Sequence, residues 1–201
     1  MRTQLKQNVT LKLMDSRVFA ELEPHLTLVE CRKGEHLLNQ GDQEMEQYFV
    51  LDGILKRVVS NDSAKEMILR FAAEGDIETS YAAWRLKTPA PYSIVAVTKA
   101  QVAQLPLPKW VAFIENHPAT KHDFEYEVMR LMSEIMAHTI TLHLLDAPGR
   151  LRRFLRKHPE LADRLHKKEL ASYLNLSAET LSRLTQRERN RTAHAARAEH
   201  S

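Results

Sequence analysis

Cysteine is almost absent from this sequence, which has 201 residues and a single cysteine, Cys31. One cysteine excludes an internal disulfide and any four-cysteine iron–sulfur cluster or zinc site built by one chain. We therefore predict no metal ligands and no cofactor. Haem binding is not excluded by the sequence, because ten His and seven Met could supply axial ligands. None of them lies in a sequence motif that marks a haem ligand.

Long apolar runs are missing as well. The sequence has no run of about 18 or more apolar residues, so it predicts no membrane span. The first ten residues, MRTQLKQNVT, lack the apolar core of a signal peptide. These absences favour a cytoplasmic location.

The motifs that mark common enzyme classes are also missing. We find no Ser/His/Asp arrangement at an informative spacing, no phosphate-cradling P-loop and no paired carboxylates. A cupin-type metalloenzyme needs a ligand cluster such as His-x-His with a nearby Glu, whereas GEHLLNQGDQE offers only His36. We therefore predict that the protein is not an enzyme, and keep the cupin-type enzyme as an alternative.

Glycine is scarce, and four of the five glycines fall between Leu26 and Leu107. There they separate short apolar runs such as YFVLDGILKRVV, EMILRF and YSIVAV. Glycine supplies the positive-φ turns of hairpins, and short runs at this spacing are typical of an antiparallel sandwich or small barrel. We expect a β-roll domain over residues 1–117, with one or two short helices in residues 1–25.

From Pro118 onward the pattern becomes helical. Apolar residues recur at alternating steps of four and three, as in the a/d seam of a coiled coil. We favour a homodimer through this seam over burial within the chain, with a dimerisation helix at 118–146 and a helix break at Asp146-Ala147-Pro148-Gly149. The seam consists of Phe124, Val128, Leu131, Ile135, His138, Leu142 and Leu145.

Charge is unevenly distributed along the chain. Residues 147–201 contain 13 Lys and Arg against 6 Asp and Glu, a net charge of +7. The whole chain carries +3, so the first 146 residues carry −4. A basic C-terminal quarter on an acidic body is expected when one end of a protein meets a polyanion.

The stretch KKELASYLNLSAETLSRLTQR, residues 167–187, has the pattern of two short helices that cross steeply. Ala171 suits the closest approach of the helices, Asn175 tolerates the positive φ of the turn, and Ser177 can cap the second helix. Together with a small shared core, these positions predict a helix-turn-helix. The expected core residues are Leu170, Leu174, Leu176, Leu181 and Leu184.

The second helix presents Glu179, Ser182 and Arg183 on one face. Arg can bond bidentately to guanine, Glu can accept from cytosine, and Ser can serve either base, so we predict base contacts in the major groove of double-stranded DNA. A surface Glu–Arg pair is the simpler explanation of the same spacing. The expected phosphate contacts are Lys167, Lys168, Ser177, Thr180, Arg187 and Arg189, with Arg191 nearby.

The order and spacing of these pieces resemble the Crp/Fnr family of bacterial transcription regulators. The resemblance is carried by KGEHLLNQGD, YFVLDGILKRV, KEMILRFAAEGD, the long helix ending in LLDAPGR, and the helix-turn-helix. It implies an α+β fold: an antiparallel double-stranded β-helix or jelly roll of the cyclic-nucleotide-binding type, a dimerisation helix and an all-α DNA-binding domain. ETLSR at 179–183 is similar to the Fnr-type recognition helix, which implies a TTGAT-like half-site.

This chain differs from the cyclic-AMP receptors at the positions where those receptors bind their ligand. Those receptors use a Gly-Glu pair on the ribose and an Arg-Ser pair on the phosphate, whereas this chain has Thr79-Ser80 and Ala90-Pro91. A buried phosphate without its arginine would be an uncompensated charge, so we predict that cyclic AMP is not the effector. An unknown effector, or none, would meet a pocket of Leu69, Thr79, Ser80, Tyr92, Ile135 and Met136.

The DNA-binding part is shorter than the family pattern. We expect a reduced winged-helix or helix-turn-helix domain at 147–188, without the usual two-stranded wing, and a basic disordered tail at 189–201. RNA polymerase would be a further partner if the protein activates transcription. The alternative is a ligand-sensing β-roll dimer that acts on a protein partner through the helix pair.

Overall fold

The computed structural model describes the backbone of residues 2–61 and 66–198, and side chains within 3–61 and 66–188. The chain divides into two units, Met1–Met136 and Ala137–Ser201. Helix α5, Pro118–Leu144, continues through this division. The division therefore lies inside the long helix. The domain boundaries suggested by the sequence, after residue 117 and at Asp146–Gly149, stay predictions.

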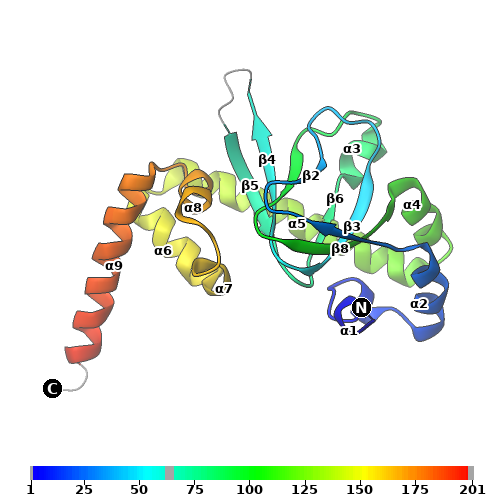
Figure 1. Ribbon diagram of the computed structural model, residues 1–201, viewed down its shortest axis with the longest axis horizontal. Coiled ribbons are helices and arrows are strands. Elements are labelled where there is room, and N and C mark those ends of the chain that lie inside the picture. The colour runs from blue at the N-terminus through cyan, green and yellow to red at the C-terminus, as the bar shows by residue number, and fades with distance from the viewer. Residues whose placement is uncertain (1, 62–65, 199–201) are drawn as a thin grey trace. The chain divides into compact units, whose positions relative to one another are not determined.

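Two four-stranded antiparallel sheets form the body of the first unit (Figure 1). The strand orders are β1-β8-β3-β6 and β2-β7-β4-β5. The arrangement confirms the predicted α+β fold with an antiparallel β-roll. The strands are β1 (Thr27–Cys31), β2 (His36–Leu38), β3 (Glu46–Asp52), β4 (Leu55–Ser60), β5 (Glu66–Ala72), β6 (Ile77–Thr79), β7 (Ser93–Ala96) and β8 (Ala100–Pro106).

Short helical segments precede the strands, as the sequence predicted for residues 1–25. They are α1 (Arg2–Leu5), the 3-10 turns η1 (Leu11–Leu13) and η2 (Glu23–His25), and α2 (Ser16–Leu22). Asp15 caps α2, because its carboxylate accepts a hydrogen bond from the Arg17 N–H at 2.8 Å.

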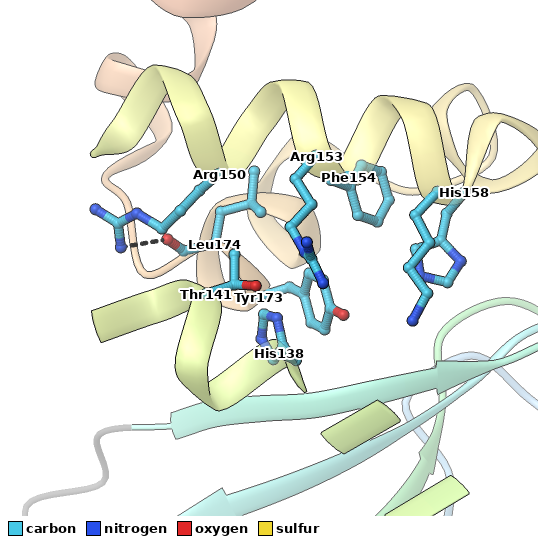
Figure 2. Close-up of a pocket in the computed structure, with 9 residues that line it drawn as sticks. His138, Thr141, Arg150, Arg153, Phe154, His158, Tyr173 and Leu174 are labelled. Atoms are coloured by element: carbon cyan, nitrogen blue, oxygen red, sulfur yellow. Dashed lines mark hydrogen bonds between the residues drawn. The ribbon is translucent and has the colours of Figure 1, made fainter. Parts of the chain in front are cut away.

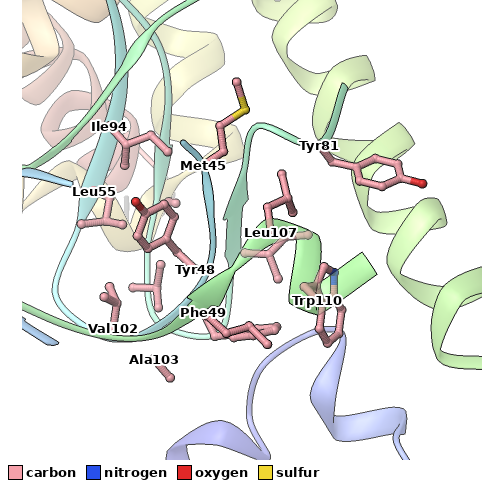
Figure 3. Packing of buried hydrophobic residues seen from close by; sticks show 14 of the residues in the cluster. Met45, Tyr48, Phe49, Leu55, Tyr81, Ile94, Val102, Ala103, Leu107 and Trp110 are labelled. Carbon is pink, nitrogen blue, oxygen red and sulfur yellow. The ribbon is translucent and has the colours of Figure 1, made fainter. Parts of the chain in front are cut away.

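Strand β3 is buried on both of its faces (Figure 3). Successive side chains of a strand point to opposite sides, so Tyr48 and Phe49 meet different neighbours. Tyr48 Oη donates to the Leu37 carbonyl of β2, in the other sheet, at 2.7 Å. Phe49 packs edge-on against Trp110 of α4 (Leu107–Glu115), with ring centroids 5.4 Å apart. The core therefore extends from between the sheets to the helices.

Gly53 forms the turn between β3 and β4. Its φ is +84°, and a side chain there would collide with the backbone carbonyl of Lys99. Its N–H donates to the Glu74 carboxylate at 2.8 Å. Glycine is required at this position for both its conformation and its lack of a side chain.

An aromatic cluster anchors the first half of α5 to the β-roll. Phe124 is fully buried, and its ring meets Trp110 and Tyr81 edge-on with centroids 5.2 Å apart in both pairs. Tyr81 begins the short helix α3 (Tyr81–Leu86). The start of α5 is therefore part of the core of the first unit.

The predicted dimer seam faces this core over its first half. Phe124 and Leu131 are 0% and 2% exposed, and Val128 packs partly against the core. The seam residue His138 stacks on Tyr173 within the second unit, with centroids 3.8 Å apart, while Ile135 and Leu142 are half-buried and Leu145 is exposed. Phe124 and Leu131 are therefore buried within their own chain. The sequence analysis had favoured a dimer contact for these positions.

A different row of α5 side chains is apolar and exposed. Because an α-helix has 3.6 residues per turn, this row lies on roughly the opposite side of α5 from the predicted seam. Its members are Tyr126, Met129, Met132, Met136, Ile140 and Leu144, with exposed fractions from 46% to 78%. We call it the α5 apolar row.

The second unit continues from α5 into four helices, α6 (Ala147–Lys157), α7 (Pro159–Ala162), α8 (Lys167–Tyr173) and α9 (Ala178–Ala198). The predicted helix break is confirmed, since α5 ends at Leu144. Asp146 caps α6 by accepting the Gly149 N–H at 2.8 Å. Within the described residues 137–198 the structure contains helices and no strand.

Helix α9 extends further than the sequence suggested. Its backbone is helical to Ala198, so the region from 189 to 198 is helix where a disordered tail was expected. The segment has no Gly or Pro and is rich in Arg and Ala, which favour helix. Residues 199–201 lie outside the described residues.

Candidate nucleic-acid interface and effector pocket

The turn between α8 and α9 is held by the two hydrogen bonds of a Schellman motif. The Leu176 N–H donates to the Ala171 carbonyl at 2.8 Å, and the Asn175 N–H donates to the Ser172 carbonyl at 3.1 Å. Asn175 has a φ of +51°, as the sequence predicted. This geometry ends α8 sharply and fixes the direction in which α9 starts.

Ser177 caps α9, as predicted. Its Oγ accepts a hydrogen bond from the Thr180 N–H at 3.1 Å and donates to Thr180 Oγ1 at 2.9 Å. The core predicted for the helix pair is also present, although Leu176 is only half-buried. The buried residues are Leu170, Ala171, Leu174, Leu181 and Leu184.

The predicted base-reading side chains point away from this core. Glu179, Ser182 and Arg183 are all exposed on the first turns of α9. Because Leu181 and Leu184 fix the opposite side of the helix, these three side chains share an accessible face. The structure thus brings together the three residues that the sequence selected.

The predicted phosphate contacts whose side chains are described fall into two groups. Lys167, Lys168 and Arg187 are exposed, and both lysines lie in the first turn of α8. The hydroxyls of Ser177 and Thr180 bond to each other, so a phosphate would have to compete with the cap. The side chain of Arg189 lies outside the described residues, as does that of Arg191.

The sequence reasoning missed the contribution of α6 to this interface. Arg150 Nη1 donates to the Leu174 carbonyl at 2.8 Å and to the Asn175 carbonyl at 3.4 Å, which supports the turn from behind. Arg152 pairs with Glu188 of α9 at 3.4 Å. The segment GRLRRFLRK, with five basic residues and no acid, was the available signal.

A buried ionic network lies beside some of the residues that were predicted to line an effector pocket. Glu78 is fully buried, and its Oε2 accepts from Arg57 Nη2 while its Oε1 accepts from Arg70 Nη1, both at 2.6 Å. Arg57 also donates to the Thr79 carbonyl at 3.0 Å. Burial acts to lower the pKa of Arg57, but the charge of Glu78 outweighs it and the pKa is raised, so Arg57 stays charged.

Two of the predicted pocket residues belong to this network. Tyr92 Oη donates to the Thr79 carbonyl at 2.9 Å, and the Arg57 guanidinium lies 4.1 Å from the Tyr92 ring centroid. Ser80 is buried beside them. Leu69 and Ile135 are half-buried and Met136 is 65% exposed, so the six residues do not share one buried site. We name Arg57, Arg70 and Glu78 the β-roll ion network.

The described residues form neither a metal site nor a membrane span. They contain no group of three or more His, Cys, Asp or Glu placed to hold a metal ion. None of their helices is long and apolar enough to cross a membrane.

Comparison with known protein families gives a match within the first unit. Residues 28–117 match the family of the cyclic nucleotide-binding domain. No curated protein sequence matches the chain significantly.

Solved structures extend the likeness to both units. FixK2 from Bradyrhizobium japonicum has 17% identity and a TM-score of 0.72, and the match covers 83% of this chain and 86% of FixK2. A CooA variant from Carboxydothermus hydrogenoformans has 16% identity and a TM-score of 0.73, with coverages of 91% and 84%. A Crp/Fnr-family transcriptional regulator from Eubacterium rectale has 12% identity and a TM-score of 0.72, with coverages of 92% and 88%. At these identities the likeness shows the fold, and it confirms the predicted resemblance to Crp/Fnr regulators.

Proposed function

We propose that this chain, which has a cyclic nucleotide-binding domain within the fold of Crp/Fnr-family regulators, is a DNA-binding transcriptional regulator. It would bind an inverted repeat of TTGAT-like half-sites as a homodimer, controlled by an effector other than cyclic AMP. The observation that carries the proposal is the capped helix pair, whose second helix exposes Glu179, Ser182 and Arg183 together. No catalytic role is proposed.

The chemistry of the exposed face suits a base-edge contact. An arginine can donate two parallel hydrogen bonds to guanine O6 and N7, and a glutamate can accept from the amino group of cytosine. A TTGAT half-site read on both strands offers both bases. The exposed lysines at the start of α8 add contacts to phosphates, which carry no sequence information but supply much of the affinity.

Homodimerisation would place two copies of α9 on a two-fold axis, matching the symmetry of an inverted repeat. The α5 apolar row supports this arrangement better than the predicted seam, because its side chains are exposed. Tyr126, Met129, Met132 and Met136 give a continuous apolar strip along one side of the helix. Methionine adapts to irregular partners, which suits a self-complementary interface.

The effector is not expected to be a cyclic nucleotide. In the β-roll ion network, each carboxylate oxygen of Glu78 is paired with an arginine, and Asp76 Oδ2 lies 3.5 Å from Arg70 Nη2, so two acids already face the two arginines. A cyclic phosphate would have to displace Glu78, leaving that carboxylate buried without a partner. We expect calorimetry to detect no micromolar binding of cyclic AMP or cyclic GMP; binding of either at that level would overturn this part of the proposal.

The readout residues are tested by comparing two substitutions on two duplexes. Arg183→Ala should weaken binding to a duplex that carries the TTGAT-like inverted repeat by about 1–3 kcal/mol. It should also relax the preference for guanine in that site. Lys168→Ala should weaken binding to specific and random duplexes alike. It should also make the binding constant less dependent on salt concentration. Titration by fluorescence anisotropy at several salt concentrations measures both effects. An equal loss on both duplexes for Arg183→Ala would remove that residue from base readout.

The second candidate is a sensor that acts on a protein, with the helix pair as its docking surface. The same exposed face is compatible with that role, because Glu179 and Arg183 could pair with charges on a protein. Footprinting separates the candidates, since the regulator protects a palindrome with half-site centres about one helical turn apart. RNA polymerase is a proposed further partner if the protein activates transcription.

A further inference from the structure

The guanidinium of Arg150 reaches from α6 to the end of α8 (Figure 2). Its Nη1 donates to the Leu174 carbonyl at 2.8 Å, drawn as a dashed line, and to the Asn175 carbonyl at 3.4 Å. Arg150 is half-buried, and its Nε is a buried atom. The side chain is therefore turned inward, onto the backbone of the α8–α9 turn, and not outward to solvent.

The two carbonyls that Arg150 contacts lie beyond the last hydrogen bonds of α8. The final carbonyls of a helix have no partner within it, and the Schellman bonds of this turn use those of Ala171 and Ser172. The carbonyls of Leu174 and Asn175 follow them along the chain. A guanidinium suits this place, because charge-assisted hydrogen bonds are the stronger ones and a cation complements the negative end of the helix dipole.

Asn175 makes the geometry of this turn depend on its surroundings. Its φ of +51° lies in the left-handed region, which is unfavourable for residues other than glycine, although Asn tolerates it better than most. Such conformations persist where neighbouring groups hold them in place. The Leu174 carbonyl belongs to the peptide group before Asn175, and the Asn175 carbonyl to the one after it. Arg150 therefore restrains the backbone on both sides of this residue.

Helix α6 gives Arg150 a fixed base. Phe154, one turn further along the same side of α6, is buried and meets the Tyr173 ring edge-on, with centroids 5.7 Å apart. Tyr173 is the last residue of α8 and directly precedes the two residues that Arg150 contacts. Phe154 and Arg150 together therefore hold three successive residues at the end of α8 against α6, and Figure 2 shows both side chains facing the turn.

The direction of α9 decides whether its exposed face can reach base edges. Arg183 lies roughly 10 Å beyond the turn at a rise of about 1.5 Å per residue, so a tilt of α9 by about 10° would move it by roughly 2 Å. A hydrogen bond to a base edge is lost by a shift of this size. Contacts of basic side chains to phosphates tolerate it far better, because they act largely through charge.

We propose that Arg150 is a positioning residue for sequence readout, which fixes the direction of α9 without contacting DNA itself. This role rests on the proposed function, because it concerns the face formed by Glu179, Ser182 and Arg183. Loss of the guanidinium leaves the helix pair folded and lets α9 tilt about Asn175. Discrimination between base sequences then falls, while the attraction to phosphates is retained.

Arg150→Met removes the hydrogen-bond donors and keeps much of the side-chain volume. Fluorescence anisotropy on the full-length protein gives the ratio of its affinities for a TTGAT-like inverted repeat and for a random duplex. We expect Arg150→Met to lower this ratio about tenfold, with an unchanged salt dependence on the random duplex. Arg150→Lys should lower it less, because an ammonium can donate to one of the carbonyls but lacks the planar fork. Arg156→Met is the matched control, because it removes the same charge from an exposed position of α6, and it should keep the ratio within about twofold.

Adding Asn175→Gly to Arg150→Met separates the direction of α9 from the stability of the turn. Glycine enters the left-handed region freely, so the melting temperature should recover while the affinity ratio stays low. Recovery of the ratio would overturn the proposal, because Arg150 would then only stabilise the turn.

Two results with Arg150→Met alone would also overturn the proposal. A parallel loss on both duplexes with a shallower salt dependence would make Arg150 a phosphate contact. An unchanged ratio would leave the proposed function standing without this role for Arg150. Equal affinities of the unmodified protein for the two duplexes would overturn both the role and the proposed function.

Discussion

Glu78→Gln is expected to lower the free energy of unfolding of the first unit by about 3–5 kcal/mol. The carboxylate is fully buried and is the partner of Arg57 and Arg70, which are 1% and 6% exposed. A neutral amide would leave two buried positive charges poorly compensated. Urea unfolding followed by tryptophan fluorescence measures the change, since Trp110 is buried in the same unit.

Glu66→Gln is the matched control for this substitution. Glu66 also pairs with a basic side chain on a strand, Lys56, but at 3.8 Å and with its own side chain 53% exposed. A pair at this distance with one partner in solvent contributes about 0–1 kcal/mol. If Glu78→Gln cost no more than Glu66→Gln, Glu78 would not be the carboxylate that compensates the two buried arginines, and the argument against a cyclic phosphate would lose its support.

The double substitution Met129→Glu with Met136→Glu is expected to convert the proposed dimer into folded monomers. Both side chains are more than 60% exposed in the single chain, so the substitutions should barely change its stability. In a dimer formed through the α5 apolar row they would bury charges without partners. Each should raise the dissociation constant by more than about tenfold. Sedimentation velocity over a range of concentrations measures it.

Two further variants separate this interface from the seam that the sequence suggested. Leu86→Glu changes an apolar residue that is 74% exposed on α3 and should leave the dimer intact. Leu131→Asp places a charge at a position that is 2% exposed and should unfold the first unit. If Leu131→Asp gave a folded monomer and the double Met variant stayed dimeric, the interface would be the seam predicted from the sequence and not the α5 apolar row.

The helix-turn-helix was predictable from sequence because its determinants are local. Asn175, Ser177 and Ala171 each serve a backbone requirement set by residues within a few positions of them. The β-roll was predictable for a similar reason, because each hairpin can be predicted from its own turn glycine and its own short apolar strands.

The face of α5 that meets its own chain could not be predicted in this way. The spacing of apolar residues defines two rows on this helix, and both have helical periodicity. The choice between them depends on Trp110 and Tyr81, which meet Phe124 across the fold. The β-roll ion network was missed for the same reason, because Arg57 and Glu78 lie on different strands.

The central claim, that the protein reads an inverted repeat as a dimer, is tested most directly by selecting duplexes from a random pool. The full-length protein would be used with and without a small-molecule extract of cells, since the effector is unknown. The account predicts enrichment of two guanine-containing half-sites in opposite orientation, with centres about one helical turn apart. Enrichment of a single unrepeated site, or of none in either condition, would contradict it.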